Sequence, residues 1–159
     1  MLQRLLTASL LLALFVGPTL AQDTDPFMRH PAVHPDGATI AFSYQGDLWT
    51  VSADGGRAER LTIHEAYEGQ PRWRPDGSQI AFTSDRYGND DVYVMNTGGS
   101  TPTRLTHHST DDALGGWTPD GHLLFSTRRT YAQAEWSNEI YQVGAAGGTP
   151  DRRLDAGGA

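Results

Sequence analysis

Short apolar runs alternate with turn-forming residues along most of this chain, and the pattern repeats. Pro-Asp-Gly occurs at 35–37, 75–77 and 119–121, so successive copies begin 40 and 44 residues apart. Each copy is followed by an apolar run, such as Ile80-Ala81-Phe82, and then by a run that starts with an acid and contains an aromatic residue, such as Asp91-Val92-Tyr93. Gly-Gly comes next, and Arg-Leu-Thr or Arg-Leu-Asp closes the unit. Repeats of about 40 residues with this punctuation are typical of β-propeller blades.

Each unit predicts four antiparallel strands, which in the second unit lie near 71–74, 79–84, 91–95 and 101–106. The runs are rich in β-branched and aromatic residues, which favour strands. The middle strands carry apolar side chains on both faces, and stacked blades cover both faces of such a sheet. The sequence therefore predicts an all-β fold within 22–159, a partial β-propeller with blades near 31–62, 71–106 and 115–155.

Three blades are fewer than the four to eight of a closed propeller, so the ring is predicted to be incomplete. The two outer flanks are then expected to expose apolar side chains. On the first blade these are Ile40, Phe42 and Trp49, and on the third they are Leu124, Phe125 and Tyr141.

Pro-Asp-Gly predicts a tight turn, because proline presets φ, aspartate bonds its own backbone and glycine accepts a positive φ. The predicted structural turn residues are Asp36, Gly37, Asp76, Gly77, Asp120 and Gly121.

Residues 1–21 have the pattern of a signal peptide. Arg4 precedes the apolar stretch Leu5–Val16, and small residues at Thr19 and Ala21 suit cleavage after Ala21. Twelve helical residues rise about 18 Å, less than the roughly 30 Å of a bilayer core, although an uncleaved anchor is the alternative. We expect export to the periplasm or the extracellular space, with no membrane association after cleavage.

Composition excludes several classes of site. The formal net charge of -7 argues against nucleic acid as a partner, because binding it requires a basic surface, and the absence of cysteine excludes disulfides and thiolate metal sites.

Motif spacing does not predict a metal or catalytic site. His30 and His34 are four residues apart, but Pro31 and Pro35 disfavour the helix that would align them. The acidic stretch 85–91 lacks EF-hand spacing. No Gly-x-Ser-x-Gly motif is present, and no catalytic residue, metal or cofactor is predicted.

Two places are candidate contact points. Asp111 and Asp112 precede the third blade, either as part of an exposed loop or as a pair of carboxylates at the mouth of the propeller. Trp136 lies in a connection that is longer than the equivalent connections of the earlier blades. Its side chain is either an exposed contact point or packed locally.

Residues 71–95 resemble the repeat of TolB-type propellers. Three stretches, 40–62, 84–89 and 108–121, are similar to the start of the N-terminal propeller of tricorn-type serine proteases. This resemblance implies the non-catalytic propeller of an exported protease, which handles peptide entry or protein contacts and belongs to a larger, candidate homo-oligomeric protein. A TolB-like interaction propeller without catalysis is the alternative, and the propeller of a prolyl-oligopeptidase-like hydrolase is a weaker one.

Overall fold

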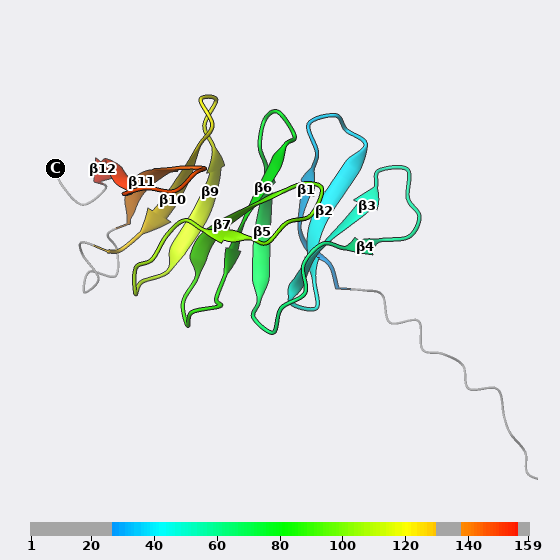
Figure 1. The fold of residues 1–159 in the computed structure, drawn as a ribbon, viewed down its shortest axis with the longest axis horizontal. Coiled ribbons are helices and arrows are strands. Elements are labelled where there is room, and N and C mark those ends of the chain that lie inside the picture. Colours follow the sequence, from blue (N-terminus) through cyan, green and yellow to red (C-terminus); the bar gives the residue numbers. More distant parts are fainter. Residues whose placement is uncertain (1–26, 130–137, 156–159) are drawn as a thin grey trace, which may run out of the picture.

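The computed structural model describes residues 27–129 and 138–155, which form strands, turns and loops and no helix (Figure 1). The predicted signal peptide and Trp136 lie outside these residues. In the described part, three separate four-stranded antiparallel sheets stand side by side, and each follows chain order. The sheets form an arc of blades that does not close into a ring, as the sequence predicted. Because helices are absent from this part, none of it forms a helical membrane span.

Each blade takes its four strands from one sequence unit. Blade 1 contains β1 (Arg29–Val33), β2 (Thr39–Tyr44), β3 (Asp47–Ser52) and β4 (Glu59–Arg60). Blade 2 contains β5 (Glu68–Trp73), β6 (Gln79–Ser84), β7 (Asp91–Asn96) and β8 (Thr103–Arg104). Blade 3 contains β9 (Asp112–Trp117), β10 (His122–Thr127), β11 (Glu139–Gly144) and β12 (Asp151–Asp155).

The first strand of each blade begins two or three residues earlier than the repeat pattern suggests, at Arg29, Glu68 and Asp112. A β-bulge causes the discrepancy in blade 2, where the register shifts between Gly69 and Arg72. Gln70 in this bulge has φ 52° and is followed by proline. Glycine and proline are unfavourable in strands, so the sequence around the bulge does not predict one. The backbone before the bulge nevertheless pairs normally with β6.

The Pro-Asp-Gly turns join the first strand to the second in each blade, and all three lie along the upper edge in Figure 1. Gly37, Gly77 and Gly121 have φ of 76°, 74° and 82°. Each glycine N–H donates to the carbonyl three residues earlier, over 2.8 to 3.0 Å. Asp36 and Asp76 also accept the N–H two residues later, at 2.8 and 2.9 Å. Two separate properties therefore stabilise these turns: glycine adopts the positive φ, and the aspartate carboxylate accepts a backbone N–H.

Blade 2 packs against both neighbours through alternating side chains. Ile80, Phe82, Tyr93 and Met95 are buried against Ala41 and Leu48 of blade 1. The intervening Ala81, Val92 and Val94 are buried in a second cluster with residues of blade 3. The predicted two-sided apolar sheet is confirmed, and each face belongs to a different interface.

The predicted open flanks are wrong in two respects. Phe42 of blade 1 is buried rather than exposed. Phe125 and Tyr141 pack in the cluster between blades 2 and 3, so they do not face the open side of blade 3. Leu124 alternates with Phe125 along β10, and these two neighbours must point to opposite faces. The open flank of blade 3 is therefore lined by Leu124 and by Ile140 of β11.

Tryptophan indoles connect neighbouring blades at the ends of the first strands. Trp73 Nε1 donates to the carbonyl of Ala32 at 2.9 Å, and Trp117 Nε1 donates to the carbonyl of Arg72 at 2.9 Å. Each indole is half-buried against the apolar cluster of its interface. The tryptophan repeat is thus a packing feature that also satisfies a strand carbonyl of the preceding blade.

Replacing Trp117 with phenylalanine is expected to lower the free energy of unfolding by about 1 kcal/mol, because one partly buried hydrogen bond is lost. Trp73→Phe removes the equivalent bond and should have an effect of similar size. Urea unfolding of both variants and the parent measures the loss. Unchanged stability in both would mean that the indole bonds contribute nothing to blade packing.

Candidate functional site

Acidic side chains are buried at the start of the third strand in every blade. Asp47, Asp91 and Glu139 begin β3, β7 and β11, and the last two are fully buried. Each is paired with an arginine of the fourth strand: Arg60 with Asp47, Arg104 with Asp91 at 2.6 Å, and Arg152 with Glu139 at 3.2 Å. A buried carboxylate needs such a partner, because desolvation of an unpaired charge is costly.

A threonine completes this arrangement in blades 1 and 2. Thr62 Oγ1 accepts the N–H of Leu48 at 2.9 Å, and Thr106 Oγ1 accepts the N–H of Val92 at 2.9 Å. In blade 2, Arg104 Nε also donates to the carbonyl of Thr106 at 2.8 Å. In blades 1 and 2, Arg-Leu-Thr therefore ties the end of the blade to its third strand.

A second set of buried acids lies on the first strands. Glu68 of β5 is paired with Arg86, and Asp112 of β9 is paired with Arg129 at 2.7 Å. Both carboxylates are fully buried. Their arginines follow the second strand by two residues, at the start of the connection to the third strand. These pairs were not foreseen from sequence, although the repeated Ser/Thr-x-Arg at the ends of β6 and β10 is a signal that could have found them.

Three exposed or half-buried aspartates gather where blades 2 and 3 meet, and we call Asp85, Asp90 and Asp111 the acidic rim. Asp111 Oδ1 accepts the N–H of Asp90 at 3.0 Å. The Nδ2 of Asn89 donates to the carbonyls of His108 and Thr110 at 3.0 and 3.1 Å. These bonds fix the hairpin 85–90 against the loop 108–111 and hold the carboxylate of Asp111. The carboxylate of Asp85 accepts the N–H of Tyr67 at 2.7 Å.

Negative charge accumulates at this rim. Burial, and then the charges of Asp111, Asp85 and Asp91, raise the pKa of Asp90 above its usual value of 3.8. The part of this rise in pKa that comes from the neighbouring carboxylates indicates negative potential at the rim. Such a surface attracts cationic groups.

The two predicted contact aspartates have different surroundings. Asp112 is fully buried in β9 and paired with Arg129, so it is not accessible to a ligand. Asp111 is exposed and belongs to the rim. They differ because β9 begins at Asp112, whereas Asp111 lies in the loop before the strand.

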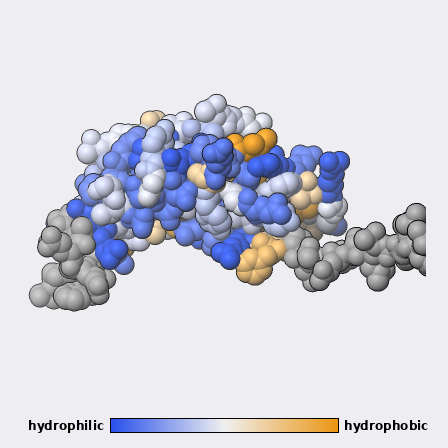
Figure 2. Space-filling view, turned by 90° about the horizontal axis from the view of Figure 1, so that it is seen from below, coloured by the Kyte–Doolittle hydropathy of each residue, from blue (hydrophilic) through white to orange (hydrophobic). Residues whose placement is uncertain are grey.

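Figure 2 shows the molecule from the end opposite the Pro-Asp-Gly turns. Hydrophilic residues cover most of this face, and hydrophobic ones form small separate spots. The view is typical of a surface for polar contacts rather than for an extended apolar partner.

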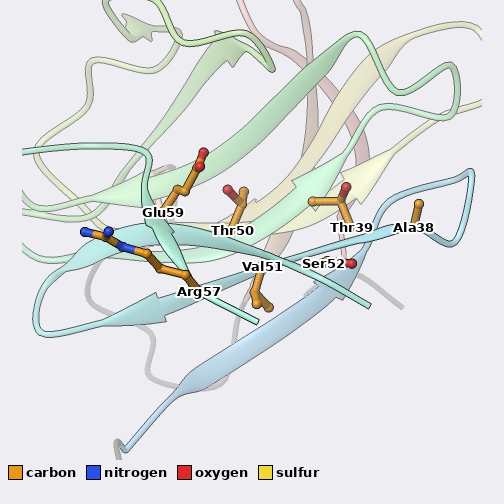
Figure 3. A pocket seen from close by; sticks show the side chains of 7 residues that line it. All are labelled: Ala38, Thr39, Thr50, Val51, Ser52, Arg57 and Glu59. Atoms are coloured by element: carbon orange, nitrogen blue, oxygen red, sulfur yellow. The ribbon is translucent and has the colours of Figure 1, made fainter. Parts of the chain in front are cut away.

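A pocket of about 450 Å³ lies on blade 1 (Figure 3). Thr50 and Glu59 extend to one side of the sheet, whereas Val51 extends to the other. The polar groups do not converge on one point, so the pocket lacks the arrangement of a ligand site. It is lined by Ala38, Thr39, Thr50, Val51, Ser52, Arg57 and Glu59.

Another pocket of about 430 Å³ contains Arg86, Arg104 and Tyr87. Both arginines are engaged with buried carboxylates, and Arg104 also stacks on the Tyr87 ring at 4.2 Å. Across residues 27–129 and 138–155, no group of three or more histidine or acidic side chains is arranged to hold a metal ion. His34 instead contacts Asp36 at 2.7 Å in the first turn.

Comparison with known proteins agrees with this architecture. Residues 25–157 match the family model of the tricorn protease N-terminal beta propeller domain. Tricorn protease homolog 1 of Streptomyces coelicolor is 40% identical over 68 residues, which are 43% of this chain and 6% of that protein.

Two solved structures share the fold. Putative TolB from Agrobacterium tumefaciens superposes with a TM-score of 0.69 at 22% identity, over 84% of this chain and 50% of that one. The tricorn protease superposes with a TM-score of 0.65 at 24% identity, over 74% of this chain and 12% of that one. The present chain therefore spans only a small part of its tricorn relatives. Because the match at 25–157 covers most of its length, the chain belongs to the family of tricorn protease N-terminal β-propeller domains.

Proposed function

We propose that this chain is the non-catalytic propeller portion of an exported tricorn-type serine protease and that it contacts peptides on their way to a catalytic site elsewhere. The family match supports the protease context. The signal-peptide pattern of residues 1–21 supports export to the periplasm or the extracellular space.

The acidic rim is the observation that carries the peptide role. Asp85, Asp90 and Asp111 present several carboxylates on loops at one end of the blades, and loops held by a rigid scaffold are common binding sites. The free α-amino group of a peptide is a cation at neutral pH, and such a rim would attract it. The chain's net charge of -7 extends this attraction beyond the rim.

A TolB-like interaction propeller is the second candidate, and the TM-score of 0.69 to a TolB structure favours it. In that case the partner is a folded protein, and free peptides have no affinity for the rim. The two functions are therefore separable by the size of ligand that binds.

Asp111→Asn is expected to weaken binding of a short peptide with a free N-terminus by about threefold, because one exposed charge contributes up to about 1 kcal/mol. Asparagine keeps an oxygen that accepts the Asp90 N–H, so the loop is preserved. Fluorescence anisotropy with a labelled peptide at low and high salt measures the affinity. Acetylating the N-terminus of the peptide should weaken binding as well.

Asp54→Asn is the matched control, since Asp54 is an exposed aspartate in the turn between β3 and β4. Asp54→Asn removes one negative charge, as Asp111→Asn does, and should leave the affinity for the peptide unchanged. Equal effects of the two variants would show that net charge alone acts, which contradicts a site at the rim. If neither peptide binds while a folded partner does, the TolB-like function replaces the peptide role.

A further inference from the structure

A polar pocket of about 430 Å³ lies beside β8, the edge strand of blade 2, and reaches His64 in the segment that follows the strands of blade 1. Tyr93 of β7 pairs directly with Arg104 of β8, so their side chains share the face of blade 2 that packs on blade 1. None of the acidic-rim residues lines this pocket. It is lined by His64, Arg86, Tyr87, Tyr93, Thr101, Pro102 and Arg104.

The lining of this pocket is rich in hydrogen-bond donors. Two guanidinium groups and three hydroxyl groups can donate there, whereas no acidic side chain is among the described residues that line it. The donors belong to Arg86, Arg104, Tyr87, Tyr93 and Thr101. Such a lining favours a ligand that carries several acceptor oxygens and negative charge.

The two arginines retain donors for a ligand, although each is paired with a carboxylate. Glu68 and Asp91 are fully buried, whereas 15% of the Arg86 side chain and 20% of the Arg104 side chain are exposed. Arg86 donates to Glu68 through Nε and Nη2. Arg104 uses the same two atoms for the Thr106 carbonyl and for Asp91. The Nη1 group of each arginine is therefore left for another acceptor.

Tyr93 supplies a buried donor that has no partner. Only 2% of this residue is exposed, and its hydroxyl makes no hydrogen bond with any described residue. Its ring lies 5.3 Å from the guanidinium carbon of Arg86. Burial raises the pKa of Tyr93 above 10.0, so the phenol keeps its proton at neutral pH. An acceptor oxygen of a ligand would remove the cost of leaving this O–H unpaired.

An apolar extension adjoins the donors. A second pocket, of about 420 Å³, shares Arg86, Thr101 and Pro102 with the first and continues to Leu61 and Ile63. Ile63 is 80% exposed, which is unusual for a large apolar side chain beside a polar pocket. The two pockets together suit a ligand with an anionic group at one end and an apolar group at the other.

We propose that this pocket binds an organic phosphate monoester, with the phosphate held by Arg86, Arg104 and Tyr93 and the organic group placed against Ile63. A phosphate monoester has three terminal oxygens and up to two negative charges, so it can accept from donors at three separate positions. A carboxylate has only two oxygens and one charge. Arginine suits phosphate because its planar group presents donors in fixed directions. The site is distinct from the acidic rim and does not depend on the peptide role of the rim.

Isothermal titration calorimetry of the full chain at constant ionic strength tests the ligand class. Phenyl phosphate should bind at least about tenfold more tightly than inorganic phosphate, because inorganic phosphate has no apolar group to bury. Benzoate, which joins a similar ring to a carboxylate, should also bind at least about tenfold more weakly than phenyl phosphate. If inorganic phosphate or benzoate binds as tightly as phenyl phosphate, the assignment to a phosphate monoester is wrong. The absence of any binding of phenyl phosphate at millimolar concentration would reject the site.

Tyr93→Phe tests the buried donor without removing an ion pair. It should weaken binding of phenyl phosphate at least about tenfold, because one hydrogen bond to a charged acceptor is lost. The hydroxyl has no described partner, so the variant should unfold at the same urea concentration as the parent. Tyr44→Phe, in β2 and outside the pocket, is the matched control and should leave the affinity unchanged. An unchanged affinity in Tyr93→Phe as well would overturn the proposed phosphate position.

Ile63→Ser tests the place of the organic group. Ile63 is exposed and lies outside the strands, so the variant should keep the fold. It should weaken binding of phenyl phosphate about threefold or more and leave binding of inorganic phosphate unchanged. Equal losses for the two ligands, or no loss for either, would contradict contact between the organic group and Ile63.

Discussion

Gly77→Val is expected to lower the free energy of unfolding by about 3 kcal/mol or more, through two separate effects. Gly77 has φ 74°, where a β-branched side chain is strained. A Cβ at this position would also lie 2.4 Å from Nε2 of His34, which belongs to blade 1. The His34 ring is fixed there by the Gly77 carbonyl at 3.2 Å and by edge contact with Trp73 at 4.7 Å between centroids, so it cannot move away freely.

Gly37→Val measures the backbone strain without the clash against His34. Gly37 has nearly the same φ, 76°, but nothing lies within 4 Å of its ideal Cβ, so the variant should lose only about 1 to 2 kcal/mol. Gly121 should give an intermediate value, because its Cβ would meet the flexible end of Arg74 at 2.7 Å. Urea unfolding of the three variants gives the order. Equal losses at Gly37 and Gly77 would show that His34 does not press on the turn of blade 2.

Arg104→Met is expected to lower the free energy of unfolding by about 3 to 5 kcal/mol at neutral pH, because it leaves Asp91 buried without its partner. Asp91 is fully buried, and its Oδ2 lies 2.6 Å from Arg104 Nη2. Methionine keeps an unbranched apolar side chain, so the change mainly removes the charge. Chemical denaturation at several pH values measures the effect.

The loss should shrink as the pH falls. Burial raises the pKa of Asp91 above 3.8, and the charge of Arg104 opposes this rise. A group with a raised pKa in the folded state contributes most stability below its unfolded pKa, and this contribution is lost as the pH rises through the folded pKa. Removing Arg104 raises the folded pKa of Asp91 further, so the loss should shrink as the pH falls from the folded pKa of the variant to that of the parent, which itself lies above 3.8.

Arg60→Met provides the comparison within the chain. Arg60 makes the equivalent pair with Asp47 in blade 1, but 40% of its side chain is exposed, against 20% for Arg104. Water can partly replace the exposed arginine, so the loss should be smaller. If Arg104→Met and Arg60→Met cost the same at every pH, the exposure of the arginine does not govern the strength of these pairs.

Local residue chemistry was enough to predict the blades. Pro-Asp-Gly determines a turn through properties of three adjacent residues, and the alternation around Ile80 and Val92 determines which side chains share a face. The sequence also contains the partners of these pairs, since an acid at the start of the third strand is followed 13 residues later by an arginine in all three units. Their pairing was missed because the acid and the arginine are 13 residues apart and meet only across neighbouring strands.

The candidate site was predicted only in part. Asp111 and Asp112 are adjacent in sequence, yet one is exposed at the rim and the other is buried with Arg129, because β9 begins between them. The rim itself joins Asp111 to Asp85 and Asp90, which belong to another blade, and no sequence pattern relates their positions.

The sequence by itself determined the repeat, the turns and the two-sided strands, since each depends on residues within one unit. The tertiary structure decided what depends on neighbouring blades. It assigned Phe125 and Tyr141 to an interface rather than a flank, placed His34 against the turn of blade 2, and brought the acidic rim together. The physical reason is that packing and electrostatic potential depend on distances between units, and the repeat pattern specifies only the order of residues within each.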